Sequence, residues 1–344
     1  MEPVEKTPLS TDQKMKNLTA IAILLGGLFL GSLLVDFVQL ATGSGFSAHI
    51  VKKYDVLESK GKTWVAFADP KVKVNVITEK DCVNCNPSEP LVWLRRALPT
   101  LEATEVERSS EIGKTLIDRF QITSIPAFVF SKEVTETDFY GQAESLFQNQ
   151  GSWYYFDMTK IGLPAGKYLQ QPEIREGDIV VGSPDAPAKI FVYSDFQCTF
   201  CQTFHTDLNR LMKEYGDKVT LVYRHLPLSI HPQAGNAALA AECANEQGKF
   251  SIYADNLFAK QEEWGGTTGT QKFKDYAWRL GLNGRTFSQC LDTQKYKDKI
   301  VVDVADADTY AISGTPATFV NDEFYGGALN EEELKAAIDK ALAQ

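Results

Sequence analysis

The feature that most constrains the fold is an ordered set of sequence signals that occurs twice. In the first set, the alternating segment KVKVNVIT (71–78) is followed by DCVNC, a helical pattern and the proline-led segment ITSIPAFVFS (122–131). In the second set, KIFVYSDF (189–196) is followed by QCTFC, a helical pattern and GTPATFVN (314–321). Strand patterns that alternate with helical patterns predict a sheet covered by helices. We therefore expect an α/β protein with two similarly organised domains.

The two sets differ in the distance between the CxxC and the proline. Cys82 and Pro126 are 44 positions apart, whereas Cys198 and Pro316 are 118 positions apart. The 74 additional positions match a long helical stretch at about 232–312. A chain of 344 residues has room for two such domains, since single cores rarely exceed about 250–300 residues. We expect the second domain to follow the plan of the first with a helical insertion.

Each CxxC is expected where a strand ends and a helix begins. There the first sulfur, of Cys82 or Cys198, lies over free backbone N–H groups at the positive end of the helix dipole. This setting favours the thiolate, which attacks disulfides and also leaves readily. The second cysteine, Cys85 or Cys201, lies nearly one turn further along, close enough to form a disulfide with the first. A redox dithiol, an inert disulfide and a metal site remain open from spacing alone, although a structural zinc site usually needs four ligands.

The proline-led strands make the redox interpretation more specific. A strand, a CxxC, a helix and a later X-Pro strand together resemble the thioredoxin superfamily. In that family the proline is cis and lies beside the CxxC, where the backbone of the preceding residue pairs with a bound peptide. The matching positions are Ile125–Pro126 and Thr315–Pro316, for which a trans proline at the start of an edge strand is the alternative. The resemblance implies thiol–disulfide exchange with no cofactor and no metal.

The second domain, residues 177–344, resembles the DsbA-like branch of thiol–disulfide oxidoreductases. Three segments carry this likeness: GDIVVGSPDAPAKIFVYSDFQCTFC, YRHLPLSIHPQAGNAALAAECANEQGKF and SGTPATFV. The helical insertion is a hallmark of that branch. The likeness implies that Cys198 is the exposed nucleophile, that Cys201 is its buried resolving partner, and that Thr315 and Pro316 form the loop facing the substrate.

The DsbA-like resemblance has two further consequences. It implies a structural disulfide between Cys243 and Cys290, with two separately buried thiols as the alternative. The dipeptide between the active-site cysteines is Thr199–Phe200, which lacks the histidine of the strongly oxidising members. The potential of those members therefore does not transfer to this chain.

The first domain, assigned to residues 62–168, resembles plain thioredoxin up to about residue 139. Pro90, five residues after Cys85, matches the proline that kinks the active-site helix of that family. The segment TEKDCVNC replaces the tryptophan-rich approach to the family's CxxC. The resemblance makes Cys82 and Cys85, with Ile125 and Pro126, a second redox site, and a structural disulfide or a metal site remain alternatives.

The N-terminal segment carries the signals of a membrane anchor. LTAIAILLGGLFLGSLLV (18–35) contains no charge and is close to the roughly 20 residues that cross a bilayer, and it extends to residue 40 if Asp36 lies at the far interface. Lys14 and Lys16 precede it and favour a cytoplasmic N-terminus, residues 1–17. A cleaved signal peptide is the alternative, although its apolar core is usually shorter. We expect a single-pass cell-membrane protein with both CxxC domains extracytoplasmic, in the periplasm or its equivalent.

Two polar segments separate the expected parts. Residues 41–61 are expected to be a tether after the transmembrane helix, and residues 169–188 are a proline-rich linker leading into the second domain.

The composition limits the partners. The net charge of −10 and the lack of a basic run argue against nucleic acid. The expected partners are cysteine-containing exported proteins, a membrane or extracytoplasmic redox partner, and the membrane itself. Two other functions stay open: a relay of electrons between the two CxxC domains and a membrane partner, and a metal-handling or structural scaffold protein without exchange activity.

Four further polar residues are expected to have ordinary structural roles. We expect Asp195 to be an acidic loop residue and His205 to lie on a helix surface. We expect His225 and His231 to pack or cap near a strand end.

Overall fold

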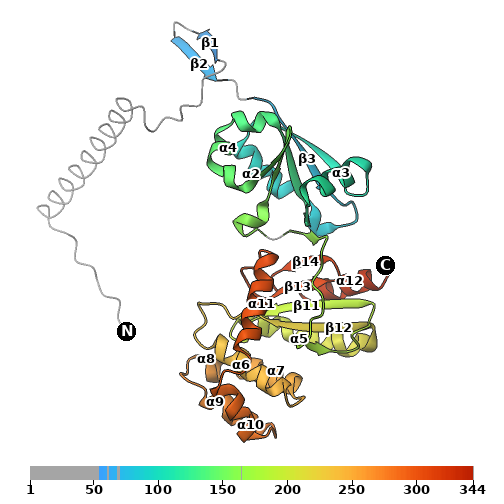
Figure 1. Cartoon of the computed structure of the whole chain (residues 1–344), viewed down its shortest axis with the longest axis vertical. Helices are drawn as coiled ribbons and strands as arrows, with labels where there is room; N and C mark the ends of the chain where they lie inside the picture. The colour runs from blue at the N-terminus through green and yellow to red at the C-terminus, as the bar shows by residue number, and fades with distance from the viewer. Residues whose placement is uncertain (1–53, 60–61, 68–69, 164, 344) are drawn as a thin grey trace, which may run out of the picture. The chain divides into compact units, whose positions relative to one another are not determined.

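The computed structural model describes residues 54–59, 62–67, 70–163 and 165–343 (Figure 1). The expected transmembrane helix at 18–40 and the segment 1–17 lie outside these residues. Within them, no helix is both long and apolar enough to span a bilayer. The chain divides into one unit that ends at Ala68 and another that begins at Asp69.

The first unit contains a hairpin of β1 (Tyr54–Ser59) and β2 (Lys62–Phe67). The strands are antiparallel, with Ser59 opposite Lys62 and Tyr54 opposite Phe67. We expected a tether up to residue 61 and a thioredoxin-like domain from residue 62. The strand β2 instead pairs with β1 in a sheet of its own, because both segments are rich in the β-branched and aromatic residues that favour strands.

The first CxxC domain contains a five-stranded sheet in the order β4-β3-β6-β8-β7. β3 is parallel to β4, and the other neighbouring pairs are antiparallel. The parallel pair needs a crossover connection, which α2 supplies. The strands are β3 (Val72–Thr78), β4 (Leu101–Glu107), β6 (Ala127–Ser131), β7 (Phe147–Gln150) and β8 (Trp153–Phe156), and the helices are α2 (Ser88–Ala97), α3 (Glu111–Phe120) and α4 (Asp138–Ala143).

The alternation in β3 divides the core of this domain between the two faces of the sheet. Val74 and Val76 pack with Leu94 of α2 on one face. Ile77 packs on the other face with Phe120 of α3 and with both cysteines of CVNC.

Pro90 lies in the first turn of α2, as the third residue of the helix. The N–H groups of a first helical turn have no partner within the helix, so a proline there removes no helical hydrogen bond. The expected kink inside the helix is therefore wrong, and Pro90 belongs to the beginning of the helix.

The second domain contains the sheet order β10-β12-β11-β13-β14, extended at its β14 edge by β9 and then β5. β11 is parallel to β12 and antiparallel to β13. All seven residues of β12 are buried, as expected for a central strand covered on both faces. The strands are β10 (Ile179–Val181), β11 (Ala188–Ser194), β12 (Val219–His225), β13 (Ala317–Val320), β14 (Glu323–Gly326), β9 (Lys167–Tyr168) and β5 (Ser124–Ile125).

The helix α5 (Thr199–Tyr215) connects the parallel strands β11 and β12, and a helical insertion follows β12. Figure 1 shows α6 to α10 grouped together beyond the sheet. The inserted helices are α6 (Ala234–Asn245), α7 (Phe250–Ala259), α8 (Gln261–Gly265), α9 (Gln271–Arg279), α10 (Gly284–Asp292) and α11 (Lys297–Thr309), and α12 (Glu331–Leu342) follows β14. The expectation of an α/β fold with a helical second domain is confirmed.

A disulfide joins Cys243 of α6 to Cys290 of α10, across a sequence separation of 47 residues. Both residues lie in the apolar core of the insertion. The bond therefore joins the first helix of the insertion, the alanine-rich α6, to α10.

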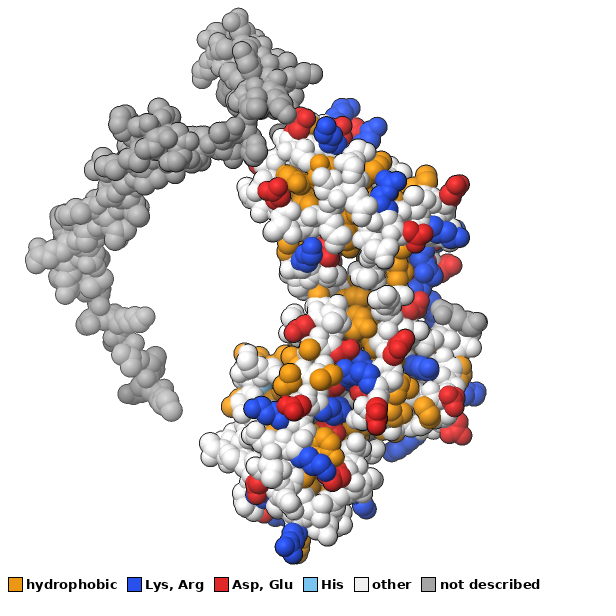
Figure 2. All heavy atoms as spheres, in the orientation of Figure 1, with side chains coloured by type: hydrophobic (Ala, Val, Ile, Leu, Met, Phe, Trp, Pro, Cys, Tyr) orange, Lys and Arg blue, Asp and Glu red, His pale blue; other side chains and the backbone are white. Residues whose placement is uncertain are grey.

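Basic and acidic side chains are interspersed over the visible face of the described residues (Figure 2). This view gives no sign of the single-signed basic surface that binds nucleic acid.

Candidate active site

Cys198 occupies the N-cap position of α5, directly after the buried strand β11 and a short turn. The N–H of Cys198 donates to the carbonyl of Asp195 at 3.1 Å, which closes this turn. The strand and the helix thus bring the first sulfur to the N-terminal end of a 17-residue helix, where unpaired N–H groups favour negative charge.

The cis-proline loop lies against the active-site cysteine. The peptide bonds Thr315–Pro316 and Ile125–Pro126 are both cis. The thiol of Cys198 donates to the carbonyl of Thr315 at 3.4 Å. A segment 117 residues further along the chain therefore forms one wall of the CTFC site.

Cys198 is less exposed than the nucleophile that we expected. Its exposed fraction is 6%, and that of Cys201 is 1%, so the loop at Thr315 covers much of the first sulfur. Phe200, between the two cysteines, is 68% exposed.

The two cysteines differ strongly in acidity. A hydrogen bond from the Cys201 thiol lowers the pKa of Cys198 to about 5, from an ordinary value of 9.0. Burial opposes this shift, and the N–H groups of Cys201 and Phe200 support it. Burial raises the pKa of Cys201, and its hydrogen bond to Cys198 raises it further. At neutral pH the pair therefore consists of one thiolate and one thiol, as an attacking and a resolving cysteine require.

This difference in acidity predicts a distinctive pH profile. In the reduced protein, the alkylation rate of Cys198 by iodoacetamide is expected to be half-maximal near pH 5 and constant from about pH 6.5 upward. In Cys201→Ala the midpoint is expected to move toward higher pH, because the hydrogen bond from the Cys201 thiol is lost. Mass spectrometry of the modified peptide gives both profiles. A wild-type midpoint between pH 8 and 9 would contradict this geometry.

Asp195 lies in the loop between β11 and α5, as expected, but its side chain is buried. Its carboxylate accepts from the N–H of Gln197 at 2.7 Å and from the N–H of Leu228 at 2.9 Å. It also lies 2.7 Å from Nδ1 of His231. Asp195 therefore ties the loop after β12 to the turn that carries Cys198. The position of Asp195 between an apolar strand and a CxxC was the sequence signal that could have indicated a role at the site. Its partners Leu228 and His231 are distant in sequence and could not be predicted from it.

The three histidines near this site each bind a carboxylate. His205 lies 2.7 Å from Asp255 and packs on the ring of Phe258, so only 12% of its side chain is exposed and the expected surface position is wrong. His225 is fully buried, 3.1 Å from Glu242, in agreement with a packing role.

The CVNC motif has a different local geometry. Cys82 precedes a single 3-10 turn, η1 (Val83–Cys85), and α2 begins only at Ser88. Cys82 is therefore not at the N-terminus of an α-helix, unlike the arrangement that we expected. The two cysteines form a disulfide, with exposed fractions of 5% for Cys82 and 0% for Cys85.

The described residues contain no cluster of three or more His, Cys, Asp or Glu side chains arranged to hold a metal ion.

The family comparison concerns the second CxxC domain. Residues 175–340 match the family model described as thioredoxin. The C-terminal domain is a thioredoxin-like domain. The match begins after the first CxxC domain, whose sheet and cis-proline follow a similar plan. The thioredoxin-like C-terminal domain thus contains Cys198, Cys201, Thr315 and Pro316.

Curated relatives match part of the chain. A Na(+)/H(+) antiporter NhaA 3 of Salinispora tropica is 38% identical over 176 residues, which are 51% of this chain and 26% of that protein. A Na(+)/H(+) antiporter NhaA 1 of Mycolicibacterium gilvum is 33% identical over 181 residues, 51% of this chain and 28% of that protein. This chain spans about a quarter of the length of these relatives.

Two solved structures are similar to about half of the chain. BdbD from Bacillus subtilis, in its oxidised form, is 25% identical with a TM-score of 0.46, and the match covers 51% of this chain and 97% of that one. DsbA2 from Pseudomonas aeruginosa is 28% identical with a TM-score of 0.41, covering 47% of this chain and 92% of that one.

Proposed function

We propose that this protein is a membrane-anchored, extracytoplasmic thiol–disulfide oxidoreductase that acts on cysteine-containing exported proteins through Cys198 and Cys201. The observation that carries the proposal is the pairing of a low-pKa cysteine at a helix N-cap with a buried, high-pKa cysteine one turn later. The N-terminal apolar segment at 18–40 supports the anchor and the export of both domains.

The exchange runs through one mixed disulfide. The Cys198 thiolate attacks one sulfur of a client disulfide, so a Cys198–client bond forms and the second client sulfur leaves as a thiolate. Cys201 then gives up its proton to the second client sulfur and attacks Sγ of Cys198. The Cys198–Cys201 bond forms as the Cys198–client bond breaks, and the client sulfur of that bond leaves as a thiolate that takes a proton from water, so the client is released with two thiols. The reverse sequence oxidises a client dithiol, and each direction transfers two electrons.

The low pKa of Cys198 favours the oxidising direction. A pKa of about 5 stabilises the dithiol form of the protein by about 2–3 kcal/mol at pH 7 relative to a pair with ordinary thiols. This corresponds to a reduction potential that is about 60 mV more oxidising. The stabilisation is present at neutral pH and is lost as the pH falls through about 5. We propose that this shift makes the Cys198–Cys201 disulfide a stronger oxidant of client thiols than a pair of cysteines with ordinary pKa values.

Loss of activity in a single variant tests this function. Full-length oxidised protein is mixed with a peptide that has two thiols, and the rate of peptide oxidation is measured. Cys198→Ser is expected to reduce this rate to the uncatalysed level, at least about 100-fold, because no other sulfur at this site attacks. The control variant Cys82→Ser/Cys85→Ser is expected to retain the rate. Unchanged activity in Cys198→Ser would contradict the proposal, and equimolar zinc binding without exchange would favour the metal-handling alternative.

A further inference from the structure

The segment that connects the two CxxC domains pairs with the cis-proline loop of the first domain. The strand β5 immediately precedes Pro126, and its Ile125 lies opposite Lys167 of β9. The N–H of Gly166 donates to the carbonyl of Ile125 at 3.1 Å, and the N–H of Leu169 donates to the carbonyl of Thr123 at 2.7 Å. The backbone edge beside the first CxxC is thus occupied by the chain's own strand, in the way that a free edge accepts an extended peptide.

The same segment lies directly on the CVNC turn. A Cβ atom on Gly166 would be only 1.9 Å from the carbonyl oxygen of Asn84 and 2.8 Å from the backbone nitrogen of Cys85. Only glycine allows this approach of two backbones. The nearly complete burial of Cys82 and Cys85 accompanies this close contact.

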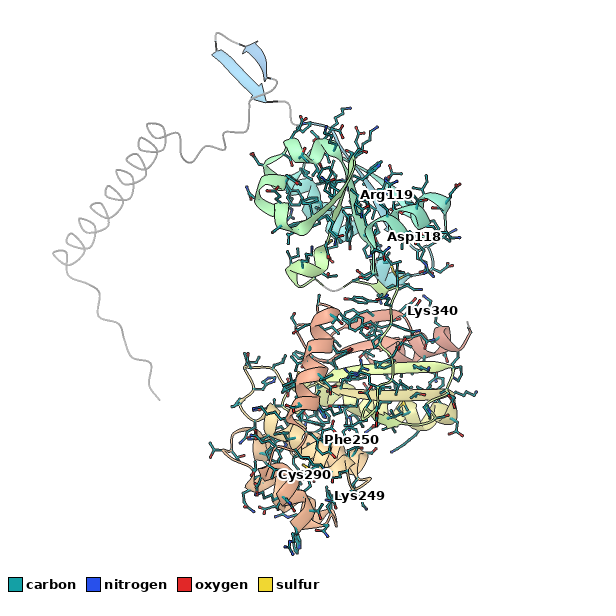
Figure 3. The ribbon with its side chains drawn as sticks, viewed as in Figure 1. Asp118, Arg119, Lys249, Phe250, Cys290 and Lys340 are labelled. Carbon is teal, nitrogen blue, oxygen red and sulfur yellow. A yellow bond between two sulfur atoms is a disulfide. The ribbon has the colours of Figure 1, made fainter. Side chains whose placement is uncertain are left out.

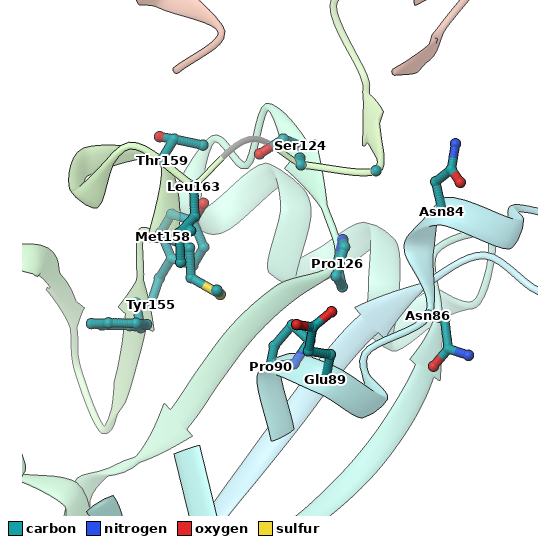
Figure 4. A pocket seen from close by; sticks show the side chains of 13 residues that line it. Asn84, Asn86, Glu89, Pro90, Ser124, Pro126, Tyr155, Met158, Thr159 and Leu163 are labelled. Atoms are coloured by element: carbon teal, nitrogen blue, oxygen red, sulfur yellow. The ribbon is translucent and has the colours of Figure 1, made fainter. Parts of the chain in front are cut away.

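A cavity lies beside the covered edge. A cavity of about 190 Å³ lies next to cis-Pro126, and Asn84 and Ser124 contribute to its lining (Figure 4). Ala165 and Gly166 of the connecting segment form part of the wall. The connecting segment therefore bounds the space beside cis-Pro126 on one side.

The connecting segment is also bound to the second domain. The N–H of Phe324 donates to the carbonyl of Gly166 at 3.0 Å, and Lys167 lies opposite Glu323 of β14. The Lys167 ammonium, only 5% exposed, lies 2.9 Å from a carboxylate oxygen of Glu79 in the first domain and 2.9 Å from one of Asp322 in the second. The strand β9 therefore contacts both domains, through backbone pairing with β5 and β14 and through the ion pairs of Lys167.

Two direct contacts join the CVNC loop to the second domain. The Asn84 side chain donates to the carbonyl of Phe324 at 3.0 Å. The ammonium of Lys340, which is labelled on α12 in Figure 3, donates to the carbonyl of Asp81 at 2.6 Å. The residues immediately before and within the first CxxC are thus used for domain contact.

The second CxxC domain shows the contrast within the same molecule. Thr315 holds the position that matches Ile125, but β13 begins only at Ala317, and no strand in the described part of the chain pairs with Thr315. Its carbonyl instead accepts the Cys198 thiol. Among the described residues, no strand pairs with the backbone at Thr315, whereas β9 pairs with the backbone at Ile125.

We propose that the first domain uses its CxxC edge to bind the chain's own segment 165–169 and the edge strand β14, and that Cys82–Cys85 is a structural bond of this contact. The disulfide shapes the turn on which Gly166 rests and from which Asn84 reaches β14. It exchanges no electrons with protein thiols while the two domains are joined. This inference is independent of the function proposed for Cys198 and Cys201.

Mapped reduction of the full-length oxidised protein tests this inference. The protein is treated with graded dithiothreitol, quenched with iodoacetamide and mapped by mass spectrometry. We expect Cys82–Cys85 to be reduced at least about 100-fold more slowly than Cys198–Cys201, with the buried bond Cys243–Cys290 as an internal reference. Reduction of Cys82–Cys85 at the rate of Cys198–Cys201 would overturn the proposal, whatever the activity of the second site.

A matched pair of glycine variants adds a second readout. Gly166→Ala forces the segment away from Asn84 and is expected to accelerate reduction of Cys82–Cys85 at least about tenfold. Gly235→Ala introduces the same methyl group in α6, where the added Cβ would meet no atom within 4 Å other than its chain neighbours and the adjacent helix backbone, and it is expected to leave the rate unchanged. A folded Gly166→Ala protein in which Cys82–Cys85 is reduced at the wild-type rate would also overturn the proposal. If this variant does not fold, the comparison of Cys82–Cys85 with Cys198–Cys201 in the wild-type protein decides.

Discussion

Cys201→Ala protein is expected to accumulate mixed disulfides between Cys198 and its clients. The wild-type intermediate is short-lived, because Cys201 lies one turn from Cys198 and resolves it within the same site. Without Cys201, release requires an external thiol, so the lifetime of the mixed disulfide is expected to increase by several orders of magnitude. Non-reducing electrophoresis after incubation with a disulfide-containing peptide measures the trapped fraction.

Two controls separate this effect from nonspecific oxidation. Cys198→Ala is expected to trap nothing, because the thiol of Cys201 is buried and its pKa is raised. Cys201→Ala/Cys82→Ala/Cys85→Ala is expected to trap as much as Cys201→Ala. Equal trapping by Cys198→Ala would show that another sulfur attacks.

Arg224→Met is expected to lower the free energy of unfolding by about 3–5 kcal/mol. The fully buried guanidinium of Arg224 lies 3.0 Å from Asp178 and 2.5 Å from Asp306, and it donates to the carbonyl of Glu173 at 2.5 Å. Burial acts to raise the pKa of Asp178, but the N–H of Arg175 and the guanidinium of Arg224 bring it below its usual value. Methionine matches the length of the arginine stem and leaves the buried carboxylate of Asp178 without this cation.

Arg210→Met is the matched control for this loss of stability. Arg210 is 55% exposed and pairs with Glu331 and Asp207 at the surface. Such pairs contribute at most about 1 kcal/mol, so little change is expected. Denaturant unfolding of the oxidised proteins measures both values. A loss below 1 kcal/mol in Arg224→Met would contradict the role assigned to this cluster.

The features that the sequence predicts are those that depend on short stretches of the chain, through hydrophobic periodicity or capping residues. The strands that precede each CxxC, the helical insertion and the terminal helix all have clear periodicity or capping residues. The terminal helix begins with a capping box, in which Asn330 and Glu333 bind each other's backbone N–H groups. The pairing of Cys243 with Cys290 was implied by the family resemblance and did not follow from spacing.

The features that were not predicted depend on contacts distant in sequence. The strand β9 contains only two residues, too few to show any alternation, and its partners are 42 and 44 positions earlier and 156 positions later. The burial of Asp195 depends on N–H groups that β12 and its loop bring near, 33 residues away. Sequence repetition suggested two similar redox sites, whereas these contacts make the two sites different.

Whether Cys198 is the attacking sulfur is tested most directly by identifying the sulfur that is bonded to the client in the Cys201→Ala complex. The trapped complex is digested without reduction, and the cross-linked peptides are identified by mass spectrometry. We expect the client peptide to be bonded to Cys198. A client peptide bonded instead to Cys82 or Cys85 would contradict it.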